Sequence, residues 1–233
     1  MIEINTLATG STGNCYWITD GITPLLLECG ISFKSIQKAL NFKTSDIAGV
    51  LVTHEHKDHC KAVNEVADRG LNIYMSLGTK NALGIDHHRV KVVENKKQFR
   101  IGTWIILPFD TEHDVSEPFG FLLASENGGK LLFLTDSYYC RYKFSGITHL
   151  MLECNYSKAI LDANVTCGRV HEFLKKRIMS SHFSLENVLD FLKVNDLSKV
   201  QEIHLLHLSH SNSDEALFKK EVQELTGKLV FVP

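Results

Sequence analysis

The segment VLVTHEHKDHC, residues 50–60, constrains the fold of this chain more than any other. A short β-branched apolar run, typical of a buried strand, leads directly into His54, His56, Asp58 and His59. In an extended segment, residues two apart lie on one side, so His54 and His56 face together. Imidazole and carboxylate groups gathered at a strand end suit zinc, manganese or iron. The fold must therefore bring further ligands to this strand end.

Three more candidate ligands follow apolar runs elsewhere in the chain. His113 comes after TWIILPF, Asp136 ends KLLFLTD, and His207 lies near the end of QEIHLLHLS. Because each lies at a strand end, all three can reach a common edge of the sheets. With residues 50–60 they predict two clusters of three or four ligands and one bridging carboxylate. Two metal ions about 3.5–4 Å apart clamp the attacking and leaving oxygens of a displacement.

Strand and helix patterns alternate along the whole chain. Each half has a run of short apolar strands followed by strand–helix units, which predicts an α/β fold: two mixed β-sheets packed face to face with helices outside. No linker composition interrupts it, so we expect a single domain over residues 1–233. Asn212 and Glu215 are spaced as a helix capping box. The expected helices cover residues 32–40, 60–70, 165–180, 184–195 and 212–225.

Composition narrows the class of partner. The 233 residues include 25 Lys and Arg against 27 Asp and Glu, a formal charge of -2. This balance argues against a protein that coats nucleic acid by charge alone, but it allows an enzyme that grips phosphates through metal ions. The start, MIEINTLATGSTG, lacks a signal-peptide pattern, and no apolar run is long enough to span a membrane. We therefore expect a cytoplasmic protein with free thiols.

The order HxHxDH, then His, Asp and His, resembles the metallo-β-lactamase superfamily of hydrolases over nearly the whole chain. The resemblance implies an αββα sandwich with two divalent metal ions. Zinc is the default for a histidine-rich site, and the two carboxylates keep manganese open. The implied ligands are His54, His56 and His113 for one ion, and Asp58, His59 and His207 for the other, with Asp136 bridging.

Smaller motifs narrow the resemblance. GSTGNCYWI, SHFSLENV and HLSHSN are similar to the single-domain YycJ-like (WalJ-like) branch, whose relatives include phosphodiesterases and nucleases. SHFSLENV also resembles the histidine-serine-threonine segment of the tRNA 3′-end endonucleases, in which the histidine lies near the leaving group. That match implies that His182 is the general acid. The chain has no long Gly/Pro-rich insertion like the tRNA-gripping arm, which argues against tRNA processing.

These motifs predict a dinuclear metal-dependent phosphodiesterase, an exonuclease-type nuclease acting on nucleic acid through a metal-bridging hydroxide. Asp58 and Asp136 would orient the hydroxide, and His182 would protonate the leaving alkoxide. The expected substrate contacts are Ser11, Thr12, Asn14 and His210.

Other functions stay open on the sequence alone. They are a phosphodiesterase for a small nucleotide such as a cyclic mononucleotide, a thioester or lactone hydrolase, and a non-catalytic metal-stabilised binding protein. A homodimer is also left open, and the compact form suits a bacterial or phage protein.

Overall fold

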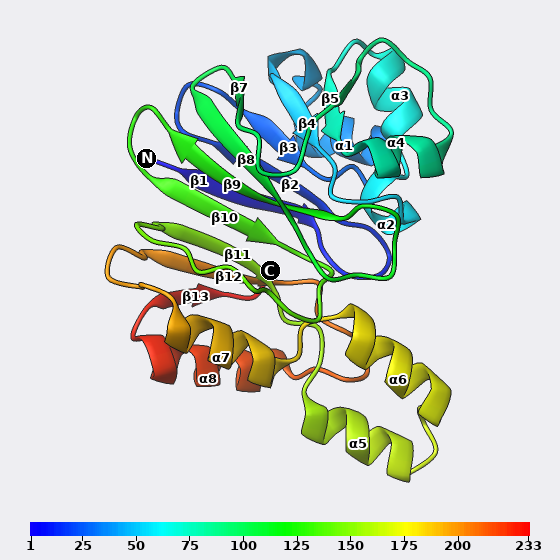
Figure 1. Cartoon of the computed structure of the whole chain (residues 1–233), viewed down its shortest axis with the longest axis vertical. Coiled ribbons are helices and arrows are strands. Elements are labelled where there is room, and N and C mark those ends of the chain that lie inside the picture. Colours follow the sequence, from blue (N-terminus) through cyan, green and yellow to red (C-terminus); the bar gives the residue numbers. More distant parts are fainter. The chain divides into compact units, whose positions relative to one another are not determined.

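The computed structural model describes all 233 residues, whose strands and helices are drawn in Figure 1. The chain divides into two compact units. The first contains Met1–Asp110 and Val115–Gly129, and the second contains Thr111–Asp114 and Lys130–Pro233. None of the helices combines the length and the apolar character needed to cross a membrane.

The first unit contains a six-stranded mixed sheet in the order β1-β2-β3-β4-β5-β6. Its first three strands pair antiparallel, and β3 to β6 pair parallel. The parallel strands β3 and β4 are fully buried, as expected for strands covered on both faces. The strands are β1 (Glu3–Ala8), β2 (Cys15–Thr19), β3 (Leu25–Leu27), β4 (Gly49–Leu51), β5 (Ile73–Met75) and β6 (Val90–Val92).

Short helices follow the parallel strands of this sheet (Figure 1). Phe33 and Ile36 of the first helix share a buried core with Val50 and Ile73 of the sheet and Val66 of the third helix. This core fixes the strand ends, from which the side chains of the segment 50–60 emerge. The helical elements are α1 (Phe33–Ala39), η1 (Thr44–Asp46), α2 (Lys57–Cys60), α3 (Val63–Asp68) and α4 (Leu77–Leu83).

Three antiparallel strands complete the first unit: β7 (Phe99–Ile101), β8 (Trp104–Asp110) and β9 (Phe119–Ser125). Asp20, at the turn after β2, ties these strands to the first sheet. Its Oδ2 accepts 2.6 Å hydrogen bonds from the hydroxyls of Thr103 and Ser125.

We expect Asp20→Asn to destabilise the protein by about 2–3 kcal/mol, because an amide nitrogen cannot accept both hydroxyl bonds. Burial opposes ionisation of Asp20, but the hydroxyls of Ser125 and Thr103 and the amides of Thr23 and Ile22 outweigh it and lower its pKa to about 2. Because its folded-state pKa is lowered, the Asp20 carboxylate stabilises the fold fully above the unfolded-state pKa of about 4. This stabilisation is lost as pH falls toward 2. Urea unfolding should therefore show a difference between wild type and variant that narrows over that window. The exposed Asp86→Asn is the control.

The second unit contains four parallel strands in the order β10-β11-β12-β13. The fully buried β11 lies inside this sheet, and α8 packs along β13. The strands are β10 (Lys130–Leu134), β11 (His149–Glu153), β12 (Glu202–Leu206) and β13 (Leu229–Phe231). The helices are α5 (Lys158–Thr166), α6 (Glu172–Ser181), α7 (Leu185–Val194) and α8 (Glu215–Thr226).

Two details of the predicted helices in this unit are wrong: the start of one helix and the cap of another. The expected helix over residues 165–180 begins only at Glu172, because Gly168 takes a positive φ of 76° and ends the preceding helix, α5, which the sequence did not reveal. The predicted capping box at Asn212 is also wrong. Asp214 caps α8 by accepting from the Leu217 amide, while the buried Asn212 side chain bonds to Asn164.

Candidate metal centre

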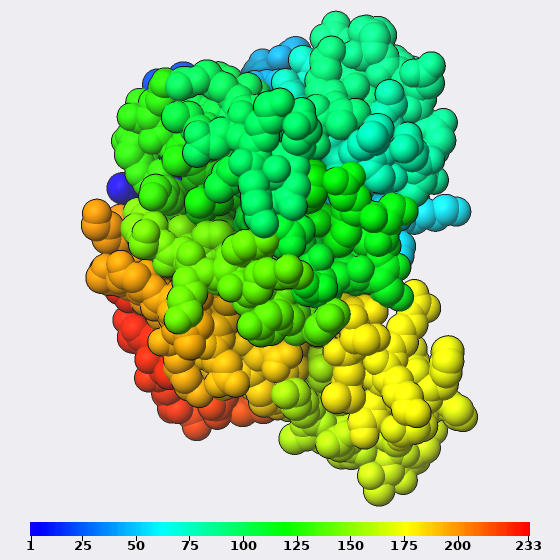
Figure 2. Space-filling view, in the orientation of Figure 1, coloured from blue at the N-terminus to red at the C-terminus, as the bar shows by residue number.

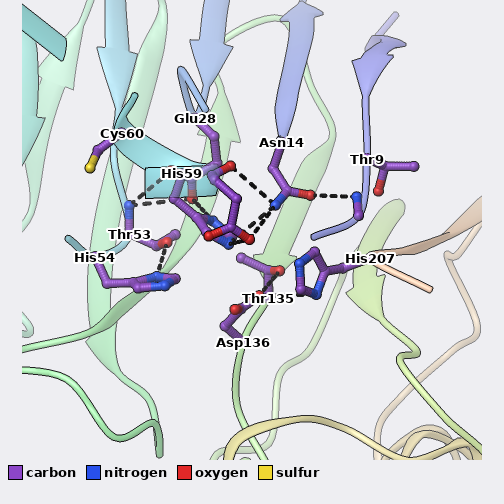
Figure 3. Close-up of polar contacts among 12 residues, drawn as sticks. Thr9, Asn14, Glu28, Thr53, His54, His59, Cys60, Thr135, Asp136 and His207 are labelled. Carbon is purple, nitrogen blue, oxygen red and sulfur yellow. Dashed lines mark hydrogen bonds and ion pairs between the residues drawn. The ribbon is translucent and has the colours of Figure 1, made fainter. Parts of the chain in front are cut away.

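In the first unit, buried polar groups at the end of β4 hold the first ligand candidates (Figure 3). Glu28 accepts hydrogen bonds from the Thr53 amide, and Thr53 Oγ1 lies 2.8 Å from His54 Nδ1. A hydrogen-bonded Nδ1 fixes the ring of a metal-binding histidine and leaves Nε2 as the coordinating atom. The ring centre of His54 lies 4.8 Å from that of His56 and 4.2 Å from that of His59.

Helix α2 begins directly after His56, whose carbonyl accepts from the His59 and Cys60 amides. This turn brings Asp58 Oδ2 to 3.4 Å from His59 Nε2. His59 is fully buried, and its Nδ1 lies 3.5 Å from Glu28 Oε1. Complete burial raises the pKa of Glu28, an effect that His59 opposes. The four ligand-type residues of segment 50–60 thus gather in a small volume, in which His54 and His59 are buried and His56 and Asp58 are partly exposed.

Asn14 supports this group from the loop before β2. Its side chain is fully buried, accepts from the Gly10 amide and donates to the Asp58 carbonyl (Figure 3). These contacts assign Asn14 to holding α2. Ser11 and Thr12, the other predicted substrate contacts of this loop, are exposed.

Gly30 permits the close approach of α2 to the loop after β3. A Cβ at this position would lie 1.6 Å from the Asp58 carbonyl oxygen and 2.8 Å from the His59 nitrogen. The Asn14 carbonyl accepts from the Gly30 amide and the Cys29 amide donates to the His59 carbonyl, so the two segments are locked at this distance.

We expect Gly30→Ala to weaken metal binding at least about 10-fold and to lower stability by about 3 kcal/mol, because a clash with backbone cannot be relieved by a rotamer change. Metal content after dialysis and thermal unfolding would measure both effects. Gly84→Ala is the control, since Gly84 caps α4 with nothing within 4 Å of a Cβ and affects stability alone. Unchanged metal affinity in Gly30→Ala would contradict the prediction.

In the second unit, two ligand candidates occupy left-handed backbone positions at strand ends. Asp136 follows β10 with φ 44°, and His207 follows β12 with φ 55°. Such conformations are costly for residues other than glycine and cluster at functional sites. Both side chains are 2–3% exposed, and His207 Nδ1 lies 3.5 Å from Asp136 Oδ1. The strand ends therefore aim a carboxylate and an imidazole at one point.

His113 approaches the same carboxylate from the segment Thr111–Asp114. Its Nε2 lies 3.8 Å from Asp136 Oδ2, and its Nδ1 lies 3.1 Å from the Ser181 carbonyl oxygen. A carbonyl can only accept, so Nδ1 carries the proton and the lone pair of His113 is on Nε2. Asp114 supports the same nitrogen at 3.4 Å and accepts from the Ser181 hydroxyl.

His182 ends α6 and contacts a residue that sequence reasoning missed. Its Nδ1 donates a 2.6 Å hydrogen bond to Glu153 Oε1, which also lies 3.2 Å from His207 Nδ1. Glu153 Oε2 accepts from the Ser137 and Phe183 amides. One ligand atom from each of Asp136, Glu153, His182 and His207 lies within 4.8 Å of the others.

The charges of this cluster favour a protonated His182. Burial would lower its pKa, but the Glu153 carboxylate outweighs burial and raises the pKa of His182. Burial would likewise raise the pKa of Glu153, but His182 outweighs burial and lowers it, so each group favours the charged form of the other. Glu153 is 1% exposed and its oxygens are used by protein donors. It is therefore placed to orient histidines more than to ligate metal.

The donor set fits divalent metal ions. In the second unit, His113 and His207 each have Nδ1 facing an oxygen acceptor, which leaves Nε2 for coordination, and the carboxylate of Asp136 lies between them. The first unit supplies imidazoles and one carboxylate of the same kind. His210, the remaining predicted substrate contact, is exposed in the turn after His207.

Comparison with known proteins agrees with this chemistry. Residues 23–207 match the profile of the family described as "Beta-lactamase superfamily domain". Exodeoxyribonuclease YycJ of Bacillus anthracis is 27% identical over 242 residues, covering 96% of this chain and 89% of that protein. Exodeoxyribonuclease WalJ of Streptococcus pneumoniae is 28% identical over 228 residues, covering 91% and 83%.

Among solved structures, the metallo-β-lactamase fold protein YhfI of Bacillus subtilis matches with a TM-score of 0.74, covering 100% of this chain and 96% of that one. Its identity of 15% means that the likeness concerns the fold. The predicted fold class, an α/β sandwich of two mixed sheets flanked by helices, is confirmed by this match.

Proposed function

This chain belongs to the β-lactamase superfamily and is a metal-dependent hydrolase, and from that premise we propose that it is an exonuclease-type nuclease. The observation that carries the proposal is the nearly full-length similarity to two proteins named exodeoxyribonucleases. The substrate is a nucleic acid strand, and the bond hydrolysed is its phosphodiester.

In this proposal the two units act as a single catalytic domain with two divalent ions. One ion would be held by His54, His56 and His113, and the other by Asp58, His59 and His207, and Asp136 would serve both. The support is the order of these residues, which resembles the family's ligand order, together with the burial of His54, His59, Asp136 and His207. Bound ions would acidify water to a hydroxide nucleophile and neutralise charge on the phosphate. Zinc or manganese would serve.

The chain's own residues supply orientation and a proton. The carboxylates of Asp58 and Asp136 orient the attacking oxygen by accepting a hydrogen bond from it. His182, held as an imidazolium by Glu153, donates its Nε2 proton to the leaving alkoxide. Glu153 holds the ring in one orientation, because its Oε1 accepts a hydrogen bond from Nδ1. Ser11, Thr12 and His210 are exposed and remain our predicted substrate contacts.

The test is incubation of zinc- or manganese-loaded protein with linear 5′-phosphorylated DNA and, in parallel, with cyclic mononucleotides. The proposal expects degradation of the DNA that is lost in Asp136→Asn. Intact DNA with opened cyclic nucleotides would replace it with a small-nucleotide phosphodiesterase. Two bound metals without cleavage of either substrate would overturn the phosphodiesterase assignment and direct attention to thioesters and lactones.

A further inference from the structure

A cavity of about 320 Å³ lies in the second unit between the loop of residues 135–148 and helix α7. Figure 2 shows the yellow-green loop against the gold atoms of α7. The cavity adjoins the candidate centre along the chain: Phe183, which lines it, directly follows His182. Tyr139, also in its lining, comes three residues after Asp136. The segments that carry the candidate acid and Asp136 therefore also contribute to the wall of this cavity.

The loop is long for one without helix or strand, which is a common mark of a functional segment. It is nevertheless firmly held. The Ser137 amide donates to Glu153, the Asn187 side chain donates to the Tyr138 carbonyl, and the Phe144 amide donates to the Asn195 side chain. The root of the loop thus shares a carboxylate with His182, and its remainder is fastened to both ends of α7.

The lining combines aromatic rings with positive charge. Phe183 and Phe191 form a buried apolar wall, whereas Tyr139 is 56% exposed at the rim. Lys143 is exposed beside it and carries a positive charge, while Arg141 pairs with Glu112. Aromatic faces next to a cation are the features by which proteins hold single-stranded nucleic acid without reading its sequence. The cavity volume is at the lower end of small-molecule sites.

We propose that this cavity is a subsite for one nucleobase of the substrate strand, with Tyr139 stacking on the base and Lys143 facing the adjoining phosphate. The assignment rests on the proposed nuclease function and adds a substrate contact to those predicted from the sequence. Stacking on a ring face is tolerant of base identity, so the subsite would position a strand in any sequence context.

The experiment pairs a protein change with a substrate change. Single-stranded oligonucleotides carry one abasic residue at the first, second or third position from the cleaved end, and kcat/KM is measured for wild type and Tyr139→Ala. Loss of stacking should lower kcat/KM about 10-fold in Tyr139→Ala on intact DNA. At one of the three positions, the abasic residue should lower kcat/KM of wild type by the same factor. At that position it should not lower kcat/KM of Tyr139→Ala any further.

Controls separate the ring from general damage. Tyr139→Phe should retain the activity of wild type, because the ring face remains. Tyr138→Ala should also retain it, since Tyr138 is an exposed neighbour outside the cavity lining. The subsite would be overturned if, at every abasic position, the losses in kcat/KM from the abasic residue and from Tyr139→Ala multiplied. A loss of kcat/KM in Tyr138→Ala equal to that in Tyr139→Ala would also overturn it.

A binding measurement keeps the subsite distinguishable from the nuclease proposal. A phosphorothioate thymidine trinucleotide is titrated into metal-loaded wild type and Tyr139→Ala by calorimetry. About 10-fold weaker binding in the variant supports the subsite even if wild type cleaves no DNA, an outcome that overturns the proposed function alone. Equal binding by both proteins overturns the subsite even if DNA cleavage is robust.

Discussion

Asp136→Asn is expected to reduce phosphodiester hydrolysis more than about 1,000-fold while leaving the metal-free fold intact. The carboxylate is 2% exposed, with Oδ1 3.5 Å from His207 Nδ1 and Oδ2 3.8 Å from His113 Nε2. In the proposed function this carboxylate is the ligand that both metal ions would share. An amide offers one neutral oxygen instead of two charged ones, so the shared position is lost.

Asparagine is chosen because it removes the negative charge of Asp136 without adding strain to the backbone. Asp136 has a positive φ of 44°, and asparagine tolerates this region better than most residues. The amide oxygen can still accept the Thr135 hydroxyl bond, which is 2.9 Å long. Stability of the metal-free variant should stay within about 1 kcal/mol of wild type, since the loss also removes repulsion with the buried Glu153.

Thermal unfolding with and without zinc or manganese measures the effect of the substitution on metal binding separately from its effect on the metal-free fold. Metal binding stabilises wild type by mass action, and the increment should shrink in Asp136→Asn as affinity falls. Asp162→Asn is the matched control, because Asp162 lies on α5 and pairs with Lys175 at the surface. A variant that keeps both its metal content and more than a tenth of the wild-type rate would show that Asp136 does not bridge.

The sequence was informative where a ligand follows an apolar strand. His54, Asp136 and His207 all end such runs, and the structure places each of them at a strand end with a buried side chain. The same signal was available for Glu28 and Glu153, which end LLLE and HLMLE. This signal does not distinguish a carboxylate that binds metal from one that accepts hydrogen bonds from N–H groups.

Contacts between distant segments explain the remaining differences. Asn14 lies in a Gly-Ser turn whose local pattern indicates substrate contact, yet its partner is the carbonyl of Asp58 in another part of the chain. The helix break before α6 depends on one glycine in the left-handed region, Gly168, within an otherwise helical periodicity. The contact of Asn14 with Asp58 has no local sequence pattern, whereas Gly168 is a possible helix stop that the helical spacing on either side of it obscures.

Removal of the candidate acid is expected to separate chemistry from stability. His182→Ala should lower the rate of DNA hydrolysis about 100- to 10,000-fold, the range for loss of a general acid. The rate on bis(p-nitrophenyl) phosphate should change less than about 10-fold, because p-nitrophenolate leaves without being protonated. Equal losses on both substrates would assign His182 to metal binding or folding instead of proton transfer.

The loss of stability in His182→Ala depends on pH, and the ion pair of His182 with Glu153 determines whether it grows or shrinks as pH rises. Burial opposes the imidazolium, but Glu153 at 2.6 Å raises the pKa of His182. A raised folded-state pKa means that the pair stabilises fully below the unfolded histidine value of about 6.5 and loses this effect as pH rises through the folded value. The metal-free His182→Ala variant should therefore be most destabilised, by about 3 kcal/mol, at acidic pH.

His182→Gln completes the test, because its amide can donate to Glu153 without a transferable proton. It should lose as much DNA hydrolysis as His182→Ala but less stability, since the buried carboxylate keeps a donor. Rates on the two substrates and unfolding between about pH 5 and 9 measure both quantities. If His182→Gln recovered DNA hydrolysis along with stability, the imidazole would be a positioning group and the leaving oxygen would take its proton from elsewhere.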